Sequence, residues 1–441
     1  MFKKQKWMAS DELISLFQRV GRATLLFDIQ DTHSGNMAVL WEDGHGKEKM
    51  VITSTGSQKG DLDREHICFI SKDTTDFGYY KASSESDIHA RILSLPGVSA
   101  SMHCHTKELS IITLDDEEKP NQPSPFVPVD PLGYFHCQGQ IPVDWVKVPS
   151  GSSQMAEIIP KRLESHPVTV IQTHGAFMKG RTLTETFFLA SIADSSGYIV
   201  RLLKRLKVDT GSLTEKIKSS PKNHFQYRPA PYTIHDEGVC EFPHESELVA
   251  DFRKTGARIF ESRISPFHTG SISIRGVKTM LYAPKASMPR EIGGPLLEVS
   301  LESLPTDTDE EKIHKLIYHE SNFQTIMHCY IPEAEAHSHF VYPGEDKIND
   351  RIIAIDAEGS FLYLVVPVIP SDADEETFLR CLHDYKVVVV RGGGVWGVGG
   401  QSLSEVLHHP SSVREICLYR IGAFEQGLDL RKMEPEKAKR W

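Results

Sequence analysis

The chain has 441 residues, of which 39% are hydrophobic and 25% charged, and its formal net charge is −11. This length is enough for two domains of about 200 residues each. The acidic balance argues against a nucleic-acid partner, which would favour a basic face, and no apolar run approaches the roughly 20 residues of a membrane helix. The seven scattered cysteines include no Cys-x-x-Cys pair, and no hydrophobic stretch follows the basic N-terminus, so we expect a reducing, cytoplasmic location without a secretory signal.

The first half of the chain alternates between helical and strand-like segments. Apolar residues recur at helical spacing from Ser10, which is a suitable helix cap. The expected elements are, in order, a helix at 10–26, strands at 36–41 and 49–55, a helix at 84–95, strands at 97–106 and 167–175, and a closing helix at 182–206. These elements predict a first domain at residues 1–207.

Residues 208–242 mix proline, glycine, serine and charge without a sustained period, which predicts a linker with one short helix. A second domain is then expected at residues 243–441. Its elements repeat the earlier order, with a helix at 246–260, two strands within 270–284, a helix at 309–321, strands at 323–333 and 385–394, and a helix at 402–422.

Two nearly identical tetrapeptides support this repetition. Met-His-Cys-His at 102–105 has a near copy, Met-His-Cys-Tyr, at 327–330. The pairs Glu85/Glu310 and His89/His314 are separated by the same 225 residues as these copies. A period of this size indicates a duplicated domain, because solenoid repeats are only about 20–50 residues long.

The first copy carries residues suited to a metal. His103 and His105 lie two apart in a predicted strand, so both imidazoles point to one face and Cys104 to the other. His174 ends another predicted strand and precedes Gly175, which suits a strand opening into a cleft. Three imidazoles with a fourth position open are typical of catalytic zinc.

Polar residues near a predicted helix start form a second set. Glu85 stands there, and taken alone it is most simply a helix-capping carboxylate. Hydroxyls, an amide and glycine-freed backbone N–H groups suit an anion such as phosphate, although each segment alone also fits turn chemistry. The residues of this set are Asn36, Thr55, Gly56, Ser83 and Ser84.

Taken in order, these segments resemble the class II (zinc-dependent) aldolase and adducin family, in its L-fuculose-1-phosphate aldolase branch. The resemblance extends over residues 10–205 through the motifs at 34–39, 52–56, 82–92, 96–106 and 170–185. It implies an α/β fold of layered α+β type, in which each of two tandem domains has a central, mainly antiparallel sheet flanked by helices. It also implies a ring of subunits with sites between neighbours.

The same resemblance assigns roles to these residues. His103, His105 and His174 would bind Zn²⁺ (or Fe²⁺ or Mn²⁺), and Glu85 would be the catalytic acid/base. Asn36, Thr55, Gly56, Ser83 and Ser84 would hold the phosphate of a small sugar-like substrate. The implied reaction is retro-aldol cleavage of a phosphorylated ketose through a zinc-stabilised enediolate, which requires no Schiff-base lysine.

The chain departs from the family pattern in several places. Lys147 aligns where aldolases carry a tyrosine, and Phe135 aligns near the acid typical of epimerases. In the second half Ser271 replaces the asparagine, Tyr330 the second histidine and Arg391 the third, so we expect no metal there. The Gly-x-Gly-x-x-Gly run at 392–397 lies at a predicted turn with too little chain after it for a nucleotide site.

Several alternatives remain open at this point. The same scaffold suits a metal-dependent decarboxylase or oxygenase, a sugar-phosphate epimerase, or a non-catalytic, adducin-like interaction protein. We also expect a homo-oligomer: if the degenerate second copy stands in for a neighbouring subunit, with residues such as His328, Tyr330 or Arg391, two chains would complete a pseudo-fourfold ring.

Overall fold

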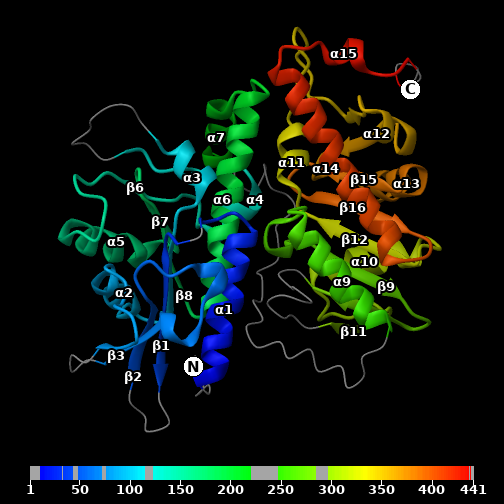
Figure 1. Cartoon of the computed structure of the whole chain (residues 1–441). Helices are drawn as coiled ribbons and strands as arrows, with labels where there is room; N and C mark the ends of the chain where they lie inside the picture. Colours follow the sequence, from blue (N-terminus) through cyan, green and yellow to red (C-terminus); the bar gives the residue numbers. More distant parts are fainter. Residues whose placement is uncertain are drawn as a thin grey trace. The chain divides into compact units, whose positions relative to one another are not determined.

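A computed structural model of the chain describes residues 10–31, 33–42, 48–71, 76–114, 123–219, 247–284, 296–436 and 438. The chain divides into two compact units, Met1–Pro128 with Leu132–Gly197 and Val129–Pro131 with Tyr198–Trp441. Within the described residues each unit contains one eight-stranded sheet with helices (Figure 1). The predicted fold class, two α/β domains with mainly antiparallel sheets, is confirmed. No helix in the described ranges is both long and apolar enough to cross a membrane.

The first unit's sheet is antiparallel except where its last two strands pair in parallel. Its central strand β5 lies between β1 and β8 and carries the Met-His-Cys sequence. The strands in sheet order are β4 (Asp76–Phe77), β3 (Ile67–Ser71), β2 (Glu48–Thr53), β1 (Asn36–Glu42), β5 (Ala100–Cys104), β8 (Gly175–Gly180), β7 (Val168–Ile171) and β6 (Val143–Asp144).

Helices cover both faces of this sheet (Figure 1). Ile88 and Ile92 of α2 and Ile159 of α5 pack with sheet residues in one buried cluster, while α1 and α6 lie on the opposite face. The helical segments are α1 (Ser10–Leu26), α2 (Ser86–Leu93), α3 (Lys107–Ile112), α4 (Pro131–His136), α5 (Ser153–Ser165), α6 (Leu183–Arg205), and the short 3₁₀ turns η1 (Lys59–Asp61) and η2 (Arg64–His66). Sequence periodicity did not predict α5, which Ser152 caps through the N–H of Met155.

The second unit's sheet has the same pattern of pairing, with one parallel pair, β14 and β15. Its strands in sheet order are β11 (Leu297–Ser300), β10 (Thr279–Ala283), β9 (Ser271–Arg275), β12 (Thr325–Cys329), β16 (Gly394–Gly399), β15 (Val387–Val390), β14 (Val365–Ile369) and β13 (Arg351–Ile353). The central strand β12 carries the second Met-His-Cys sequence.

Helices α10 and α13 pack on one face of this sheet around Trp396 of β16, and α14 packs against β12, β16 and α9. The remaining helical segments are short. The helical segments are α7 (Thr210–Ser219), α9 (Glu247–Glu261), η3 (Pro266–His268), α10 (Asp309–His319), α11 (Pro332–His337), α12 (Ala357–Leu362), α13 (Glu375–Tyr385), α14 (Leu403–Glu425) and α15 (Leu430–Met433). Of the predicted linker, α7 is the expected short helix, and residues 220–242 lie outside the described residues.

The two sheets place equivalent residues in the same register. Asn36 pairs with His103 in the first unit, and Ser271 pairs with His328 in the second. On the other side of the central strand, His103 pairs with Phe177 and His328 with Trp396. Each histidine stacks on that aromatic partner with ring centroids 4.1 Å apart. The shared register supports the duplication inferred from the sequence.

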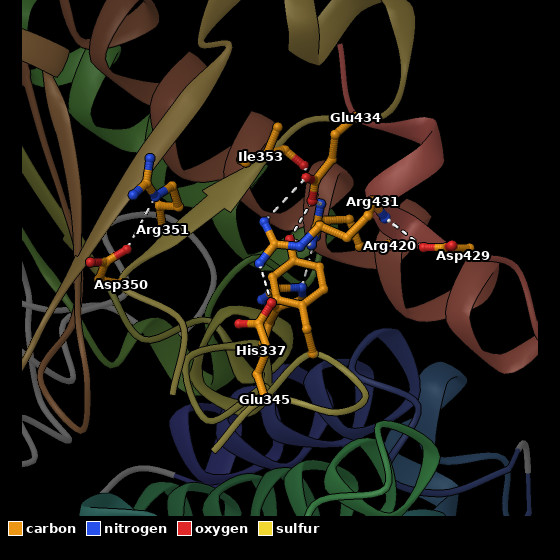
Figure 2. Close-up of polar contacts among 10 residues, drawn as sticks. His337, Glu345, Asp350, Arg351, Ile353, Arg420, Asp429, Arg431 and Glu434 are labelled. Carbon is orange, nitrogen blue, oxygen red and sulfur yellow. Dashed lines mark hydrogen bonds and ion pairs between the residues drawn. The ribbon is translucent and has the colours of Figure 1, made fainter. Parts of the chain in front are cut away.

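A buried polar cluster holds the C-terminal segment of the second unit (Figure 2). The guanidinium of Arg420 in α14 is fully buried, and it donates to the carbonyl of Ile353, the hydroxyl of Tyr342, the carboxylate of Glu434 and Nε2 of His337. Glu434 directly follows α15, so this cluster fixes α15 against the body of the unit.

Candidate metal centre

The structure brings the three predicted histidines of the first unit together. His103 lies near the end of β5, His105 follows this strand, and His174 lies in the turn between β7 and β8. One nitrogen from each ring lies within 4.8 Å of the others, and no other such group of three metal-binding side chains occurs in the described parts of the chain. His103 and His105 lie with their ring centroids 5.0 Å apart, as expected from strand alternation continuing one residue past β5.

The geometry of His103 fits a metal ligand. Its Nδ1–H donates to the carbonyl of Ala176 at 3.0 Å, so its Nε2 is the unprotonated nitrogen. This Nε2 is buried without a hydrogen-bond partner, and such an orphaned buried acceptor carries a cost that a bound metal would remove. The absent side chain of Gly175 keeps the space open, because a Cβ there would lie 3.0 Å from His103 Cε1 and 3.2 Å from His105 Cδ2.

Glu85 does not cap its helix. It occupies the N-cap position of α2, but its side chain makes no capping hydrogen bond. Instead Oε1 lies 3.0 Å from Nε2 of His174, and Oε2 accepts from Nδ2 of Asn36 at 2.7 Å. The simplest sequence interpretation of this carboxylate is therefore wrong, and Glu85 belongs to the histidine cluster.

A chain of buried hydrogen bonds orients Glu85. The hydroxyl of Ser101 lies 2.5 Å from Nδ1 of His89, and Nε2 of His89 bonds to Oδ1 of Asn36. Asn36 Oδ1 can only accept, so His89 Nε2 carries the proton, and the amide of Asn36 must turn its Nδ2–H₂ toward Glu85. The sequence marked His89 only as a repeat anchor. Its position one helical turn after Glu85 could have indicated this supporting role.

Burial and neighbouring charges set the protonation of these groups. Burial lowers the pKa of His103 to about 3 and that of His89 to about 4, so both rings are neutral near pH 7. Burial alone would raise the pKa of Glu85. The contacts with His103, His174 and Asn36 lower it by more than burial raises it, so the net pKa lies below the ordinary value. Glu85 is therefore an ionised carboxylate that can accept a proton.

The residues predicted to hold phosphate lie on neighbouring segments. Ser54 forms a β-bridge with Ala82, and the backbone N–H of Ser83 donates to the carbonyl of Thr53. Thr55, Gly56 and Ser84 are exposed, Gly56 with φ +70° and open space beside its Cα. The side-chain amide of Asn36 is engaged by Glu85 and His89, so the structure places it in the support of the carboxylate.

The equivalent position of the second unit is closed by hydrogen bonds. His328 Nδ1 lies 2.6 Å from Oε1 of Glu310, and Nε2 lies 2.8 Å from the carbonyl oxygen of Gly393. Ser271, which replaces the asparagine, bonds to both Glu310 and His314. Both nitrogens of His328 are used inside this unit, so His328 has no free nitrogen for a metal or for a neighbouring site.

The strand register corrects one sequence alignment. Trp396 matches Phe177, so the residue three positions earlier, Gly393, occupies the place of His174. Arg391, which the sequence comparison placed there, donates instead to the carbonyl of Ser338 at 3.0 Å. An alignment without structure cannot place a two-residue shift inside a glycine-rich turn. The glycine run itself forms this turn and strand β16, with no helix directly after it in this described part of the chain, which excludes a dinucleotide-binding turn.

Residues 15–199 match the family model described as "Class II Aldolase and Adducin N-terminal domain". An L-fuculose-1-phosphate aldolase from Thermus thermophilus is 22% identical, with 43% of this chain and 93% of that chain covered and a TM-score of 0.37. YgbL from Klebsiella pneumoniae, a putative aldolase/epimerase/decarboxylase, is 18% identical over 47% of this chain and 99% of that chain, with a TM-score of 0.41. No match was found among the curated proteins.

Proposed function

Residues 15–199 belong to the class II aldolase and adducin family, and from this premise we propose that the first unit is the catalytic part of a zinc-dependent lyase. Its substrate is a phosphorylated, ketose-like molecule, which it cleaves by a retro-aldol reaction. The observation that carries the proposal is the convergence of three imidazoles beside an ionised Glu85, with Nε2 of His103 buried and unpartnered.

His103, His105 and His174 would hold the metal, and three nitrogen donors suit zinc with an open position. Iron or manganese are alternatives for the same donor set. When bound, the metal supplies a Lewis acid that stabilises the negative charge developing on the substrate as its carbon–carbon bond breaks. The hydrogen bond from His103 Nδ1 to Ala176 fixes the ring so that Nε2 faces the other two histidines.

Glu85 is the proposed acid/base, which accepts the proton of a substrate hydroxyl. Asn36 holds Oε2, and His89 fixes the orientation of Asn36, so the carboxylate keeps its position while Oε1 exchanges partners. With His174 among the residues that would hold the metal, Oε1 of Glu85 would be released from its bond to this ring and could accept a proton from a substrate hydroxyl. The lowered pKa of Glu85 keeps it in the basic form near neutral pH.

At the other end of the site, exposed Gly56 and Ser84 and the hydroxyl of Ser83 would donate to a phosphate. The N–H and hydroxyl of Thr55 donate to the carbonyls of Lys81 and Ala82, so Thr55 would shape this turn. Asn36 contributes indirectly, by orienting Glu85, in addition to any contact with substrate. The residues proposed to bind the phosphate and the proposed acid/base, Glu85, lie on segments that meet at the start of α2, which supports their acting on one substrate.

The proposed organisation is a catalytic domain at 1–207, a linker at 208–242 and a degenerate domain at 243–441, in a cytoplasmic protein. The matching strand order and register of the two units support a tandem duplication. Two chains forming a pseudo-fourfold ring would give the catalytic unit its neighbour. Light scattering after size-exclusion chromatography tests this assembly, and a monomer at working concentrations would refute it.

Metal analysis combined with a screen of ketose phosphates for aldehyde release tests the chemistry. Glu85→Gln should reduce turnover by about 10²–10⁴-fold without loss of folding. The double variant His103→Ala, His105→Ala should lose both metal and activity, and retained activity would exclude the metal mechanism. Iron with oxygen uptake would favour an oxygenase, carbon dioxide release a decarboxylase, interconversion without cleavage an epimerase, and activity in no assay an adducin-like binding role.

A further inference from the structure

Lys59 in η1 is fully buried, and no carboxylate forms an ion pair with it among the described residues. Its Nζ donates to the carbonyl of Ser57 at 2.6 Å and to the carbonyl of His33 at 3.3 Å. Asp31 acts on it through electrostatics only, and burial lowers the pKa of Lys59 to about 8. A lysine is almost never fully buried unless it is paired, so this ammonium requires an explanation.

The second unit shows how this chain buries a lysine for structural reasons. Lys315 in α10 is also buried, and its Nζ lies 2.7 Å from Oδ1 of Asp307 and 2.8 Å from the carbonyl of Glu302. That lysine has the carboxylate partner that a buried charge requires. Lys59 therefore differs from Lys315 in having its charge uncompensated by a direct ion pair.

The location of Lys59 ties it to the candidate site. The carbonyl of Ser57 belongs to the turn that exposes Thr55 and Gly56, and the carbonyl of His33 belongs to the loop that leads into Gly35–Asn36. Lys59 also lowers the pKa of His105, which places its charge within electrostatic range of the metal centre. The buried ammonium of Lys59 thus contacts the backbone of two segments that border this site, at His33 and at Ser57.

These polar segments have donors but no net positive charge of their own. Asp31 brings a negative charge, but its carboxylate already accepts from the backbone N–H groups of His33 and Ser34 and is exposed to solvent. Water and salt screen an exposed charge, whereas a buried charge acts over a longer distance. At His105 the charge of Asp31 acts more strongly than that of Lys59. At the inner side of the turn, however, Lys59 is in direct contact, because its Nζ lies 2.6 Å from the carbonyl oxygen of Ser57.

We propose that Lys59 is the residue that makes this site select an anionic substrate, a phosphate monoester, over its neutral counterpart. The inference rests on the proposed function for the location of the substrate site, and it adds the charge that discriminates between ligands. Lys59 does not touch the substrate. It acts as a specificity-determining charge held behind the Thr55–Gly56 turn, and the neutral hydroxyl and N–H groups make the direct contacts.

The test compares two ligands in full-length, metal-loaded protein, with metal content measured in every variant. Dihydroxyacetone phosphate and dihydroxyacetone are titrated calorimetrically into the wild type, Lys59→Met and the matched control Lys315→Met. Removal of the buried charge should weaken binding of the phosphate ester by about tenfold or more and leave the affinity for the neutral ketone unchanged. The control should lose stability in the second unit and keep the wild-type ratio of affinities.

Equal weakening of both ligands in Lys59→Met would show a structural role and overturn the inference, as would a wild type without preference for the phosphate ester. If Lys59→Met does not fold, Lys59→Gln retains a donor for the Ser57 carbonyl without the charge and gives the same comparison. Failure of the proposed function gives a different result. If no aldehyde is released but Lys59 still determines the preference for the phosphate ester, the lyase chemistry alone is refuted. If cleavage occurs without that preference, this inference alone is refuted.

Discussion

Replacement of Arg420 tests how the second unit holds its C-terminal segment. The guanidinium is fully buried and donates to four groups, among them Oε1 of Glu434 at 3.0 Å (Figure 2). In Arg420→Met the volume is largely kept, so the cavity contribution is small. The carboxylate of Glu434, only 3% exposed, retains the hydroxyl of Tyr342 and the longer contact of its Oε2 with Arg431 at 3.9 Å, but loses its close, buried cation.

Breaking a buried pair by removing one partner costs about 3–5 kcal/mol. For a unit of this size, 1 kcal/mol corresponds to about 2–4 °C in Tm, so the transition of the second unit should fall by about 6–20 °C. Thermal and urea unfolding followed by circular dichroism measure this change. Lys312→Met is the control, because this exposed lysine pairs with exposed Asp309 in the same unit, and its loss should leave the transition nearly unchanged.

A second substitution separates charge from packing. The double variant Arg420→Met, Glu434→Leu removes both charges of this buried pair, so much of the stability lost in Arg420→Met should return. A loss below about 1 kcal/mol for Arg420→Met, or a double variant no more stable than the single one, would refute the argument that an uncompensated Glu434 causes the loss.

Three further predictions concern the first unit and acid stability. Asn36→Leu removes the donor to Glu85 Oε2 and should raise the pKa of Glu85, so the acid limb of the pH–activity profile should move to higher pH; an unchanged limb would exclude the orienting role. The folded-state pKa values of His89 and His409, about 4, lie below the unfolded value, so the stability from their neutral forms is fully present above about pH 6.5. Between about pH 6.5 and pH 4 the free energy of unfolding should fall by about 1.4 kcal/mol per pH unit for each histidine. Urea titrations at pH 7 and pH 5 measure this slope, and His89→Phe should reduce it. Chelation should lower the Tm of metal-loaded wild type but not that of His103→Ala, His105→Ala, and an equal decrease in both would place the metal elsewhere.

The convergence of the three histidines was predictable because it depends on local rules. Strand alternation fixes the common face of His103 and His105, and a strand end followed by glycine predicts an opening at His174. Long elements with clear periodicity, such as α1 and α14, were also predictable. The short strands β3 and β8 were not, because their position follows from pairing with neighbours and not from their own residue pattern.

Roles that depend on partners distant in sequence could not be predicted. Whether Glu85 caps α2 or turns to His174, 89 positions later, depends on the tertiary fold. The burial of Lys59 is invisible in a polar segment, where a lysine is ordinarily exposed. The place of Arg391 required the pairing register of β16, since turn length shifts the alignment by two residues.

Both units contain a buried glutamate beside a histidine of the central strand, but the hydrogen bonds of the two histidines differ. Each buries a glutamate at the start of a helix beside a strand histidine, Glu85 with His103 and Glu310 with His328. In the second unit each ring nitrogen of His328 has an oxygen partner, Oε1 of Glu310 for Nδ1 and the carbonyl of Gly393 for Nε2. In the first unit Nδ1 of His103 bonds to the carbonyl of Ala176, and Nε2 has no hydrogen-bond partner and lies 3.8 Å from Oε2 of Glu85, so Nε2 is the nitrogen that the proposed metal would bind. The hydrogen bonds of one imidazole thus distinguish the two units, because they occupy both nitrogens of His328 and leave one nitrogen of His103 open to the proposed metal.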